Sequence, residues 1–234
     1  MERFARSYML LGREAMEKLQ NAHVLLFGLG GVGGMAAEAL ARAGVGALTI
    51  VDNDAVSLSN LNRQILATEE TLGLSKVEVA KRRIALINPR CRVTMHELFY
   101  LPENEDIITG AFDYVVDAID TVTAKIDIIM KAKSLGIPVI SCMGTGNKLH
   151  PELLEIEDIF KTSVCPLCRV MRTELKKRGC KGLTVVYSKE KPHKTDVSFL
   201  QEGESERTPG SISFVPPAAG LLMASKVVQD LAQL

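Results

Sequence analysis

The residues best suited to chemistry begin with a glycine-rich turn that directly follows a short apolar run. In Gly28-Leu29-Gly30-Gly31-Val32-Gly33 the outer glycines have the spacing G-x-G-x-x-G. Glycine at these places lets the backbone approach a phosphate and lets the next helix pack closely on the strand. An acidic residue about 20 positions further along commonly binds ribose hydroxyls. Asp52 stands there, with Asp54 as a near competitor, so the pattern indicates a nucleotide site.

Four further polar side chains follow where a dinucleotide site normally needs only the acidic residue. They are Asn60, Arg63, Gln64 and Lys76. Nucleotidyl transfer builds charge on the attacked phosphorus and on the leaving pyrophosphate, so cations beside the phosphates favour that reaction over hydride transfer. The competing interpretation places Arg63 in a surface ion pair and makes Lys76 a solvated residue at a helix start. The amides beside Arg63 weigh against it.

Asp120 is the candidate metal ligand. It follows the apolar run 114–118, and a carboxylate at a strand end can hold Mg²⁺ against triphosphate oxygens. Asp120 could instead cap the helix that follows, a role for which Asp is well suited. Asp117 is the alternative ligand and is better explained as a structural residue.

The charge of the chain is balanced overall and uneven along its length. Residues 161–194 hold ten Lys and Arg against two Glu, a net of +8, which the zero charge of the whole chain offsets with −8 elsewhere. This local excess suits a polyanion, although a solvated helix face with a loose loop is the competing interpretation. The candidate polyanion-binding residues are Arg169, Arg172, Lys176, Lys177, Arg178 and Lys181.

The composition is that of an ordinary globular protein. The 234 residues are 47% hydrophobic and 24% charged. No apolar run approaches the ~18 residues of a membrane span, and the first residues lack the apolar core of a signal peptide. The five cysteines are odd in number and lie mostly in apolar segments, which favours a reducing compartment. We expect a cytoplasmic protein that does not associate with membranes.

Strands and helices alternate along the first part of the chain. Apolar runs predict strands over 23–27, 47–51, 92–98, 114–118 and 138–142, and helices over 8–20, 35–43, 76–88 and 122–135. The alternation is typical of a Rossmann-like α/β fold, a mostly parallel, doubly wound sheet with helices on both faces. Ligands of such sheets bind at the carboxyl ends of the strands, where Asp52 and Asp120 fall. Ser75 and Glu78 match a capping box, which places Lys76 in the first turn of its helix.

The second half of the chain is less regular. We expect a helix from Pro166 to Gly179, a strand over 184–187, a polar loop over 202–209 and a final helix from about Ala218.

These motifs together resemble a known family. The runs GLGGVG, VDNDAVSLSNLNRQ, SKVEVA, INP and DAID are similar to those of the E1-like adenylating superfamily, which activates carboxylates as acyl-adenylates. The runs RFARSYMLLG, SCMGTGNKLHP, VCPLCRVMRTELKKRG, VVYSKEKP and GSISFVPPAAG resemble the tRNA threonylcarbamoyladenosine dehydratases in particular. This closer likeness covers nearly the whole chain.

The resemblance implies a role for each matched residue. Gly28, Gly30, Gly31 and Gly33 would form the phosphate turn of an ATP site, with Asp52 at the ribose. Asn60, Arg63, Gln64 and Lys76 would bind the triphosphate, and Asp120 would hold Mg²⁺. Arg6, with Arg3 as the competing candidate, would reach the site of a second subunit, which implies a homodimer.

The resemblance also implies the reaction and the organisation of the chain. The threonyl carboxylate of N6-threonylcarbamoyladenosine (t6A) at tRNA position 37 would be adenylated and then cyclised with loss of water. A single domain, 1–234, would comprise a nucleotide-binding half, 1–145, and a basic half, 146–234, that faces tRNA and contributes to the dimer. An accessory or sulfur-relay protein is a further candidate partner.

The motif Cys165-Pro166-Leu167-Cys168 helps to distinguish this function from the alternative functions of the superfamily. Sulfur-carrier adenylyltransferases of the superfamily hold zinc through two such pairs, and a closed zinc site needs four ligands. This sequence has no second pair, which weighs against the runner-up function, adenylation of a ubiquitin-like sulfur carrier. The motif has two further interpretations: the cysteines form a redox-active pair, or they are two thiols without a function. Cys142 could be a covalent acceptor but is better explained as a core thiol. An NAD-binding oxidoreductase or a nucleotide sensor forms a third class.

Overall fold

The computed structural model describes residues 2–103, 107–199 and 208–234. Seven strands form one sheet in the order β3-β2-β1-β4-β5-β7-β6. Their bounds are β1 (His23–Phe27), β2 (Ala47–Val51), β3 (Arg92–His96), β4 (Tyr114–Asp117), β5 (Val139–Cys142), β6 (Leu154–Asp158) and β7 (Thr184–Ser188). All neighbouring pairs are parallel except β6 with β7. The predicted α/β fold with a mostly parallel sheet is confirmed.

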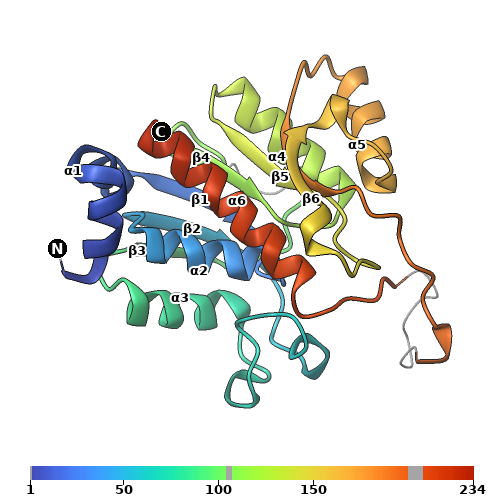
Figure 1. The fold of residues 1–234 in the computed structure, drawn as a ribbon, viewed down its shortest axis with the longest axis horizontal. Helices are drawn as coiled ribbons and strands as arrows, with labels where there is room; N and C mark the ends of the chain where they lie inside the picture. Colours follow the sequence, from blue (N-terminus) through green and yellow to red (C-terminus); the bar gives the residue numbers. More distant parts are fainter. Residues whose placement is uncertain (1, 104–106, 200–207) are drawn as a thin grey trace.

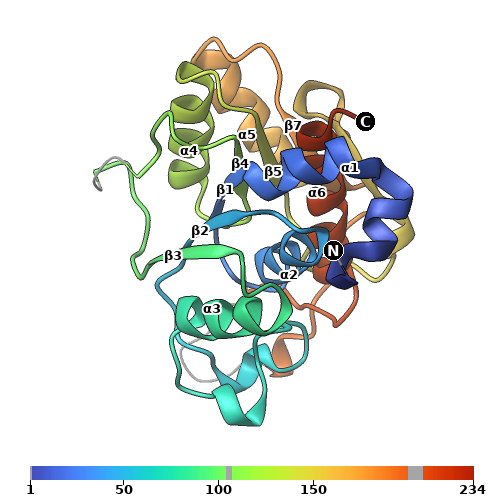
Figure 2. The same ribbon diagram turned by 90° about the vertical axis from the view of Figure 1, so that its left-hand side faces the viewer.

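Helices cover both faces of the sheet (Figures 1 and 2). They are α1 (Ala5–Asn21), α2 (Gly33–Ala43), α3 (Lys76–Ile87), α4 (Val122–Ser134), α5 (Pro166–Lys177) and α6 (Val215–Ala232). Side chains of α1, α2, α3 and α6 share one hydrophobic core, and those of α4 and α5 share the other. The strands β2, β4 and β5 are buried along their whole length because apolar residues face both cores.

The largest difference from the sequence prediction is β6, which was not expected. Its sequence, LEIED, carries three acidic residues and reads as a loop. It forms because it is an antiparallel edge strand, whose outer side faces solvent and tolerates charge. Through β7 and β6 the C-terminal half, 146–234, completes the sheet begun by the N-terminal half, 1–145.

Several boundaries also differ from the prediction. The first helix starts three residues earlier and is interrupted at Gly12, whose φ of 80° lies in the left-handed region. The final helix begins at Val215, since Pro216 and Pro217 are compatible with a first helical turn. Most of the predicted loop over 202–209 lies outside the described residues. Among those that the structure does describe, no helix is long and apolar enough to cross a membrane.

Candidate active site

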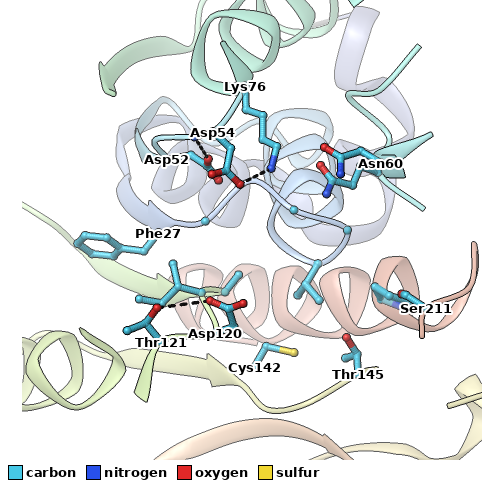
Figure 3. A pocket seen from close by; sticks show the side chains of 18 of the residues that line it. Phe27, Asp52, Asp54, Asn60, Lys76, Asp120, Thr121, Cys142, Thr145 and Ser211 are labelled. Carbon is cyan, nitrogen blue, oxygen red and sulfur yellow. Dashed lines mark hydrogen bonds and ion pairs between the residues drawn. The ribbon is translucent and has the colours of Figure 1, made fainter. Parts of the chain in front are cut away.

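The predicted nucleotide residues gather around one cavity of about 790 Å³. It opens at the carboxyl ends of β1, β2, β4 and β5, where such sheets bind ligands (Figure 3). Of the predicted residues, those lining it are Gly28, Gly30, Gly31, Asp52, Asn60, Arg63, Gln64, Lys76 and Asp120. The topology therefore brings together residues that are far apart in the sequence.

The glycine turn is fixed by close backbone approaches. Gly28 has a φ of +86°, and a Cβ there would lie 2.8 Å from the carbonyl oxygen of Ala118. A Cβ on Gly33 would lie only 1.8 Å from the carbonyl oxygen of Gly28, since α2 begins directly against the turn. A Cβ on Gly30 would have Nε2 of Gln64 as its nearest neighbour, 4.0 Å away. Gly33 is thus required by the fold, whereas Gly30 leaves room on the cavity side.

Gly33→Ala and Gly30→Ala should therefore separate stability from binding. Gly33→Ala is expected to destabilise the protein by about 3 kcal/mol, since the turn and α2 must move apart. Gly30→Ala is expected to keep its stability within about 1 kcal/mol of the parent and to weaken nucleotide binding by about tenfold, or 1.4 kcal/mol, because the methyl group occupies the approach of a phosphate. Urea unfolding and ATP titration measure the two effects. Equal stability losses in both variants would contradict this assignment.

Asp52 connects the end of β2 to the glycine turn. Its Oδ2 accepts a hydrogen bond from the amide of Leu29 at 2.6 Å, and its Oδ1 accepts one from the amide of Asp54 at 2.8 Å. Burial raises the pKa of the Asp52 carboxyl, and these two hydrogen bonds oppose the rise. Asp52 is thus placed at the turn, as a ribose-binding residue requires, while its competitor Asp54 has another contact.

Asp54 forms an ion pair with Lys76. The Lys76 ammonium, 5% exposed, lies 2.7 Å from Oδ2 of Asp54, and Figure 3 shows both side chains at the edge of the cavity. Lys76 begins α3, as predicted, but the capping box does not form: Ser75 makes no side-chain cap, and its Oγ has no partner among the described residues. Instead, the amide of Lys76 donates to the carbonyl oxygen of Asp54 at 3.0 Å. Asp54 therefore positions both ends of this lysine.

Asn60, Arg63 and Gln64 come from a short turn after β2. Asn60 caps the turn through its Oδ1, which accepts from the amide of Ser57 at 3.2 Å. Nη1 of the half-buried Arg63 donates to the carbonyl oxygen of Ser59 at 2.7 Å. Gln64 is 7% exposed, and its Oε1 has no partner among the described residues. An unsatisfied buried amide that lines a cavity fits a polar ligand.

Asp120 lies across the cavity from Lys76 (Figure 3). Its carboxylate is exposed, and among the described residues it accepts one long hydrogen bond, 3.5 Å, from the Thr121 hydroxyl. No group of three His, Cys, Asp or Glu that could hold a metal occurs among the described residues. Mg²⁺ is commonly held by one or two carboxylates together with substrate phosphates. A free carboxylate facing a phosphate turn fits that arrangement.

Asp117 takes a structural role rather than a ligand role. It is fully buried and lies 2.9 Å from the equally buried ammonium of Lys125, and it accepts from the Ser141 hydroxyl at 2.6 Å. Lys125 also donates to the carbonyl oxygens of Ile119 and Cys142, at 3.1 and 2.8 Å. This lysine thus joins the ends of β4 and β5 below the cavity. Sequence reasoning missed it, because one lysine in a predicted helix ordinarily indicates an exposed position.

A second wall of the cavity comes from segments that sequence reasoning did not assign to the site, apart from Cys142. It consists of residues 142–146, from the last residue of β5 onward, together with Pro209, Ser211 and Pro216. The two segments are joined where the amide of Asn147 donates to the carbonyl oxygen of Gly210 at 2.8 Å. The Asn62 side chain donates to the carbonyl oxygen of Ser211 at 3.0 Å. The Gly and Pro residues in these runs are the only sequence signal for such a wall.

Other predicted residues lie away from the cavity. Arg6 is exposed on α1, and Arg3, just before it, lines a separate hollow of about 440 Å³ with Arg42 and Arg83. The predicted polyanion-binding residues lie on or just after α5. Cys142 lines the cavity, but burial raises the pKa of its thiol to about 12, which suits a core thiol better than a covalent acceptor.

Comparisons with known proteins identify the family of the chain. A family model, the ThiF family, matches residues 4–234. The tRNA threonylcarbamoyladenosine dehydratase of Bacillus subtilis is 41% identical over 241 residues, which span 99% of this chain and 95% of that protein. The crystal structure of the E. coli tRNA N6-threonylcarbamoyladenosine dehydratase in complex with AMP is 34% identical, with a TM-score of 0.89 over 99% of this chain and 94% of that one. The complex of the same E. coli enzyme with ATP is 33% identical, with the same TM-score and coverage. The E1-like resemblance is confirmed: the chain belongs to the ThiF family.

Proposed function

We propose that the protein is an ATP-dependent tRNA threonylcarbamoyladenosine dehydratase, which converts t6A at position 37 of tRNA into its cyclic form. The observation that carries the proposal is the likeness to characterised dehydratases over nearly the full length of both chains. The cavity adds chemical support, because a phosphate turn, two cations and a free carboxylate face one space. We further propose that it acts in the cytoplasm, as one domain with halves 1–145 and 146–234.

The first step is attack by the threonyl carboxylate on the α-phosphorus of ATP. A new P–O bond forms, and the bond to pyrophosphate breaks. The glycine turn and the start of α2 receive the phosphates with free backbone amides, and Asp52 holds the ribose. Arg63 and Lys76 stabilise the negative charge that develops on the departing pyrophosphate. Asp54 keeps the Lys76 ammonium in place, 2.7 Å away, until the phosphates enter.

The site also fits a magnesium ion. Asp120 would hold it from the side of the cavity opposite Lys76, and the ion would neutralise charge on the triphosphate. Asp117 is excluded from this role because its carboxylate is fully buried against Lys125.

The second step is attack on the acyl-adenylate from within the same side group, which closes the ring and releases AMP. An intramolecular attack of this kind has a high effective molarity. The protein therefore needs to hold the two groups together and exclude water rather than supply a nucleophile. This agrees with the cavity, where Cys142 is the one cysteine among the lining residues and has a raised pKa.

We propose that tRNA binds along α5, through the cations that have no other partner. The side chains of Arg169, Lys176 and Lys181 are exposed and make no hydrogen bond or ion pair within the described residues. Lys177 and Arg178 both pair with Glu174, at 2.7 Å each. Arg172 donates to the backbone carbonyl oxygen of Thr162 at 3.0 Å and to its hydroxyl. Arg169, Lys176 and Lys181 are therefore the better candidates for direct contacts with tRNA phosphates. The side chains of Arg172, Lys177 and Arg178 would first have to give up their present partners in the protein.

This ranking predicts different effects of neighbouring lysines on tRNA binding. Lys176→Ala is expected to weaken binding and to reduce the slope of log affinity against log salt by about one, since one phosphate contact is lost. Lys177→Ala, its matched control on the same helix, should change the slope less because that lysine is already paired. Filter binding over a salt series measures both. If Arg169, Lys176 and Lys181 can all become Ala with no change in affinity or slope, tRNA does not bind here.

We also propose a homodimer in which Arg6 reaches the site of the second copy. Arg6 lies outside the cavity of its own chain and is exposed, as such a role requires. We keep an accessory or sulfur-relay protein as a further proposed partner.

A substrate test separates this function from its alternative. AMP should form from ATP and Mg²⁺ only when tRNA bearing t6A is present, and unmodified tRNA should give none. AMP formation or pyrophosphate exchange driven by a ubiquitin-like protein with a Gly-Gly terminus, with no response to tRNA, would favour a sulfur-carrier adenylyltransferase. Tighter binding of NAD than of ATP would favour an NAD-binding oxidoreductase or a nucleotide sensor.

A further inference from the structure

The proposed function leaves one chemically distinctive group unused, the dithiol Cys165 and Cys168. Cys165 is the N-cap of α5, and Cys168 lies one turn into that helix. Both are free and buried, with 3% and 0% of their surface exposed. Residues three apart at a helix start have Cβ atoms about 5–6 Å apart, and a disulfide requires about 4 Å. A small movement of the N-cap residue would therefore join them.

The backbone just before this pair is strained. Val164 has a φ of 62°, which is rare for a β-branched residue. The amide of Cys165 donates to the carbonyl oxygen of Ser163, two residues back, at 2.5 Å, which closes a tight three-residue turn. The Val164 side chain is 47% exposed, so burial of an apolar group does not explain the strain. The turn sets Cys165 at the helix end, and strain of this kind commonly accompanies functional positions.

The two sulfurs have opposite surroundings. Hydrogen bonds from the Cys168 thiol and from the backbone amides of Gly144, Leu167 and Cys168 lower the pKa of Cys165 below that of an ordinary thiol. The hydrogen bond between the two cysteines and the burial of Cys168 raise the pKa of the Cys168 thiol. The buried ammonium of Lys148 faces the pair and donates to the backbone carbonyl oxygen of Glu190. Cys165 is therefore the more acidic thiol and the better nucleophile of the pair, and Cys168 lies where it can resolve an intermediate formed on Cys165.

From this geometry we propose that Cys165 and Cys168 form a reversible redox couple, oxidised to a disulfide by small hydroperoxides. The Cys165 thiolate attacks the peroxide, so that an S–O bond forms, the O–O bond breaks and the leaving alkoxide or hydroxide takes a proton. Cys168 then attacks the sulfur of the sulfenic acid; the S–S bond forms, the S–O bond breaks, and the hydroxide leaves with the Cys168 proton as water. Two thiols are oxidised and one peroxide is reduced. Only a small oxidant can reach Cys165, because of its 3% exposure.

The couple is also in contact with the cavity wall. Gly144, whose amide donates to the Cys165 sulfur, lines the cavity, as does Leu167 between the two cysteines. Oxidation replaces a charged acceptor with a neutral disulfide sulfur, which accepts hydrogen bonds weakly. The segment 142–146 then loses a contact that holds it. We expect oxidation to weaken ATP binding by about threefold or more, a consequence that rests on the proposed function of the cavity.

The test uses the full-length reduced protein and hydrogen peroxide at neutral pH. The protein is quenched with N-ethylmaleimide under denaturing conditions, then analysed by intact mass and peptide mapping. The number of labelled cysteines should fall by two from the five in the chain, with a Cys165–Cys168 disulfide, and dithiothreitol should restore it. All five still labelled, or a disulfide that involves Cys91, Cys142 or Cys180, would overturn the proposal.

Cysteine variants assign the role of each thiol, in addition to the disulfide measured in the parent protein. Cys168→Ser should stop at a sulfenic acid on Cys165 that dimedone traps, and Cys165→Ser should leave Cys168 unreactive. Cys91→Ser is the matched control, since burial raises the pKa of Cys91 to about 11 and its loss should change nothing. ATP affinity is measured before and after oxidation. Unchanged affinity in oxidised protein would refute the link to the cavity, whereas no ATP binding by reduced protein would count against the proposed function and leave the disulfide result to stand alone.

Discussion

Replacing Arg63 with Ala is expected to lower AMP formation by about 100- to 1000-fold, with much smaller loss of stability. A single donor aimed at developing charge in a desolvated site contributes about that factor. Arg63 is half-buried, lines the cavity and is held by the carbonyl oxygen of Ser59 at 2.7 Å, so its charge is positioned before the substrate binds. Initial rates of AMP release with t6A-bearing tRNA measure the effect, with urea unfolding to confirm that the variant is folded.

Arg82→Ala is the matched control for this experiment. Arg82 lies on α3 outside the cavity, in an exposed pair with Glu78 at 3.0 Å, so its loss should change the rate little. Mixing inactive Arg63→Ala with inactive Arg6→Ala subunits tests the dimer at the same time. If Arg6 acts on the second copy's site, mixed dimers hold one intact site and regain activity. An Arg63→Ala rate within about threefold of the parent would mean that the guanidinium does not act on the phosphates.

Replacing Lys125 with Ala is expected to destabilise the protein by about 3–5 kcal/mol. The change removes the partner of a fully buried carboxylate, which leaves an uncompensated charge in the interior. It also removes donors from the carbonyl oxygens of Ile119 and Cys142, which hold the ends of β4 and β5 together. The free energy of unfolding in urea measures the loss.

Two further variants isolate the cause. Lys133→Ala, on the exposed side of the same helix, should change stability by no more than about 0.5 kcal/mol. Combining Lys125→Met with Asp117→Asn should recover part of the loss, because neither buried charge remains. A Lys125→Ala protein less than about 1 kcal/mol below the parent would show that the buried pair contributes little.

The fold could be predicted largely from local patterns. Apolar runs at β1, β2, β4 and β5 are short and uninterrupted because these strands are buried on both faces. The glycine spacing indicated a turn in which a side chain has no room, and the 1.8 Å approach at Gly33 is the physical basis of that pattern. Asp120 and Asp52 could be placed because parallel strands end at one edge of a sheet.

What could not be predicted depends on contacts between distant segments. The charged strand β6 exists because β7 offers an edge, and nothing within its own five residues indicates this. Lys125 is buried because Asp117 and two carbonyl oxygens surround it. The capping box at Ser75 matched a local rule, yet the helix start is held by Asp54 instead. The wall formed by residues 142–146 with Pro209, Ser211 and Pro216 is equally non-local.

The most direct test of the central claim is the mass of the modified nucleoside after reaction. The protein is incubated with ATP, Mg²⁺ and tRNA carrying t6A, and the tRNA is digested to nucleosides for mass spectrometry. The account predicts that t6A is replaced by a species lighter by one water, with one AMP released for each conversion, and that neither change occurs without ATP. AMP release with t6A left unchanged, or loss of water without ATP, would contradict it.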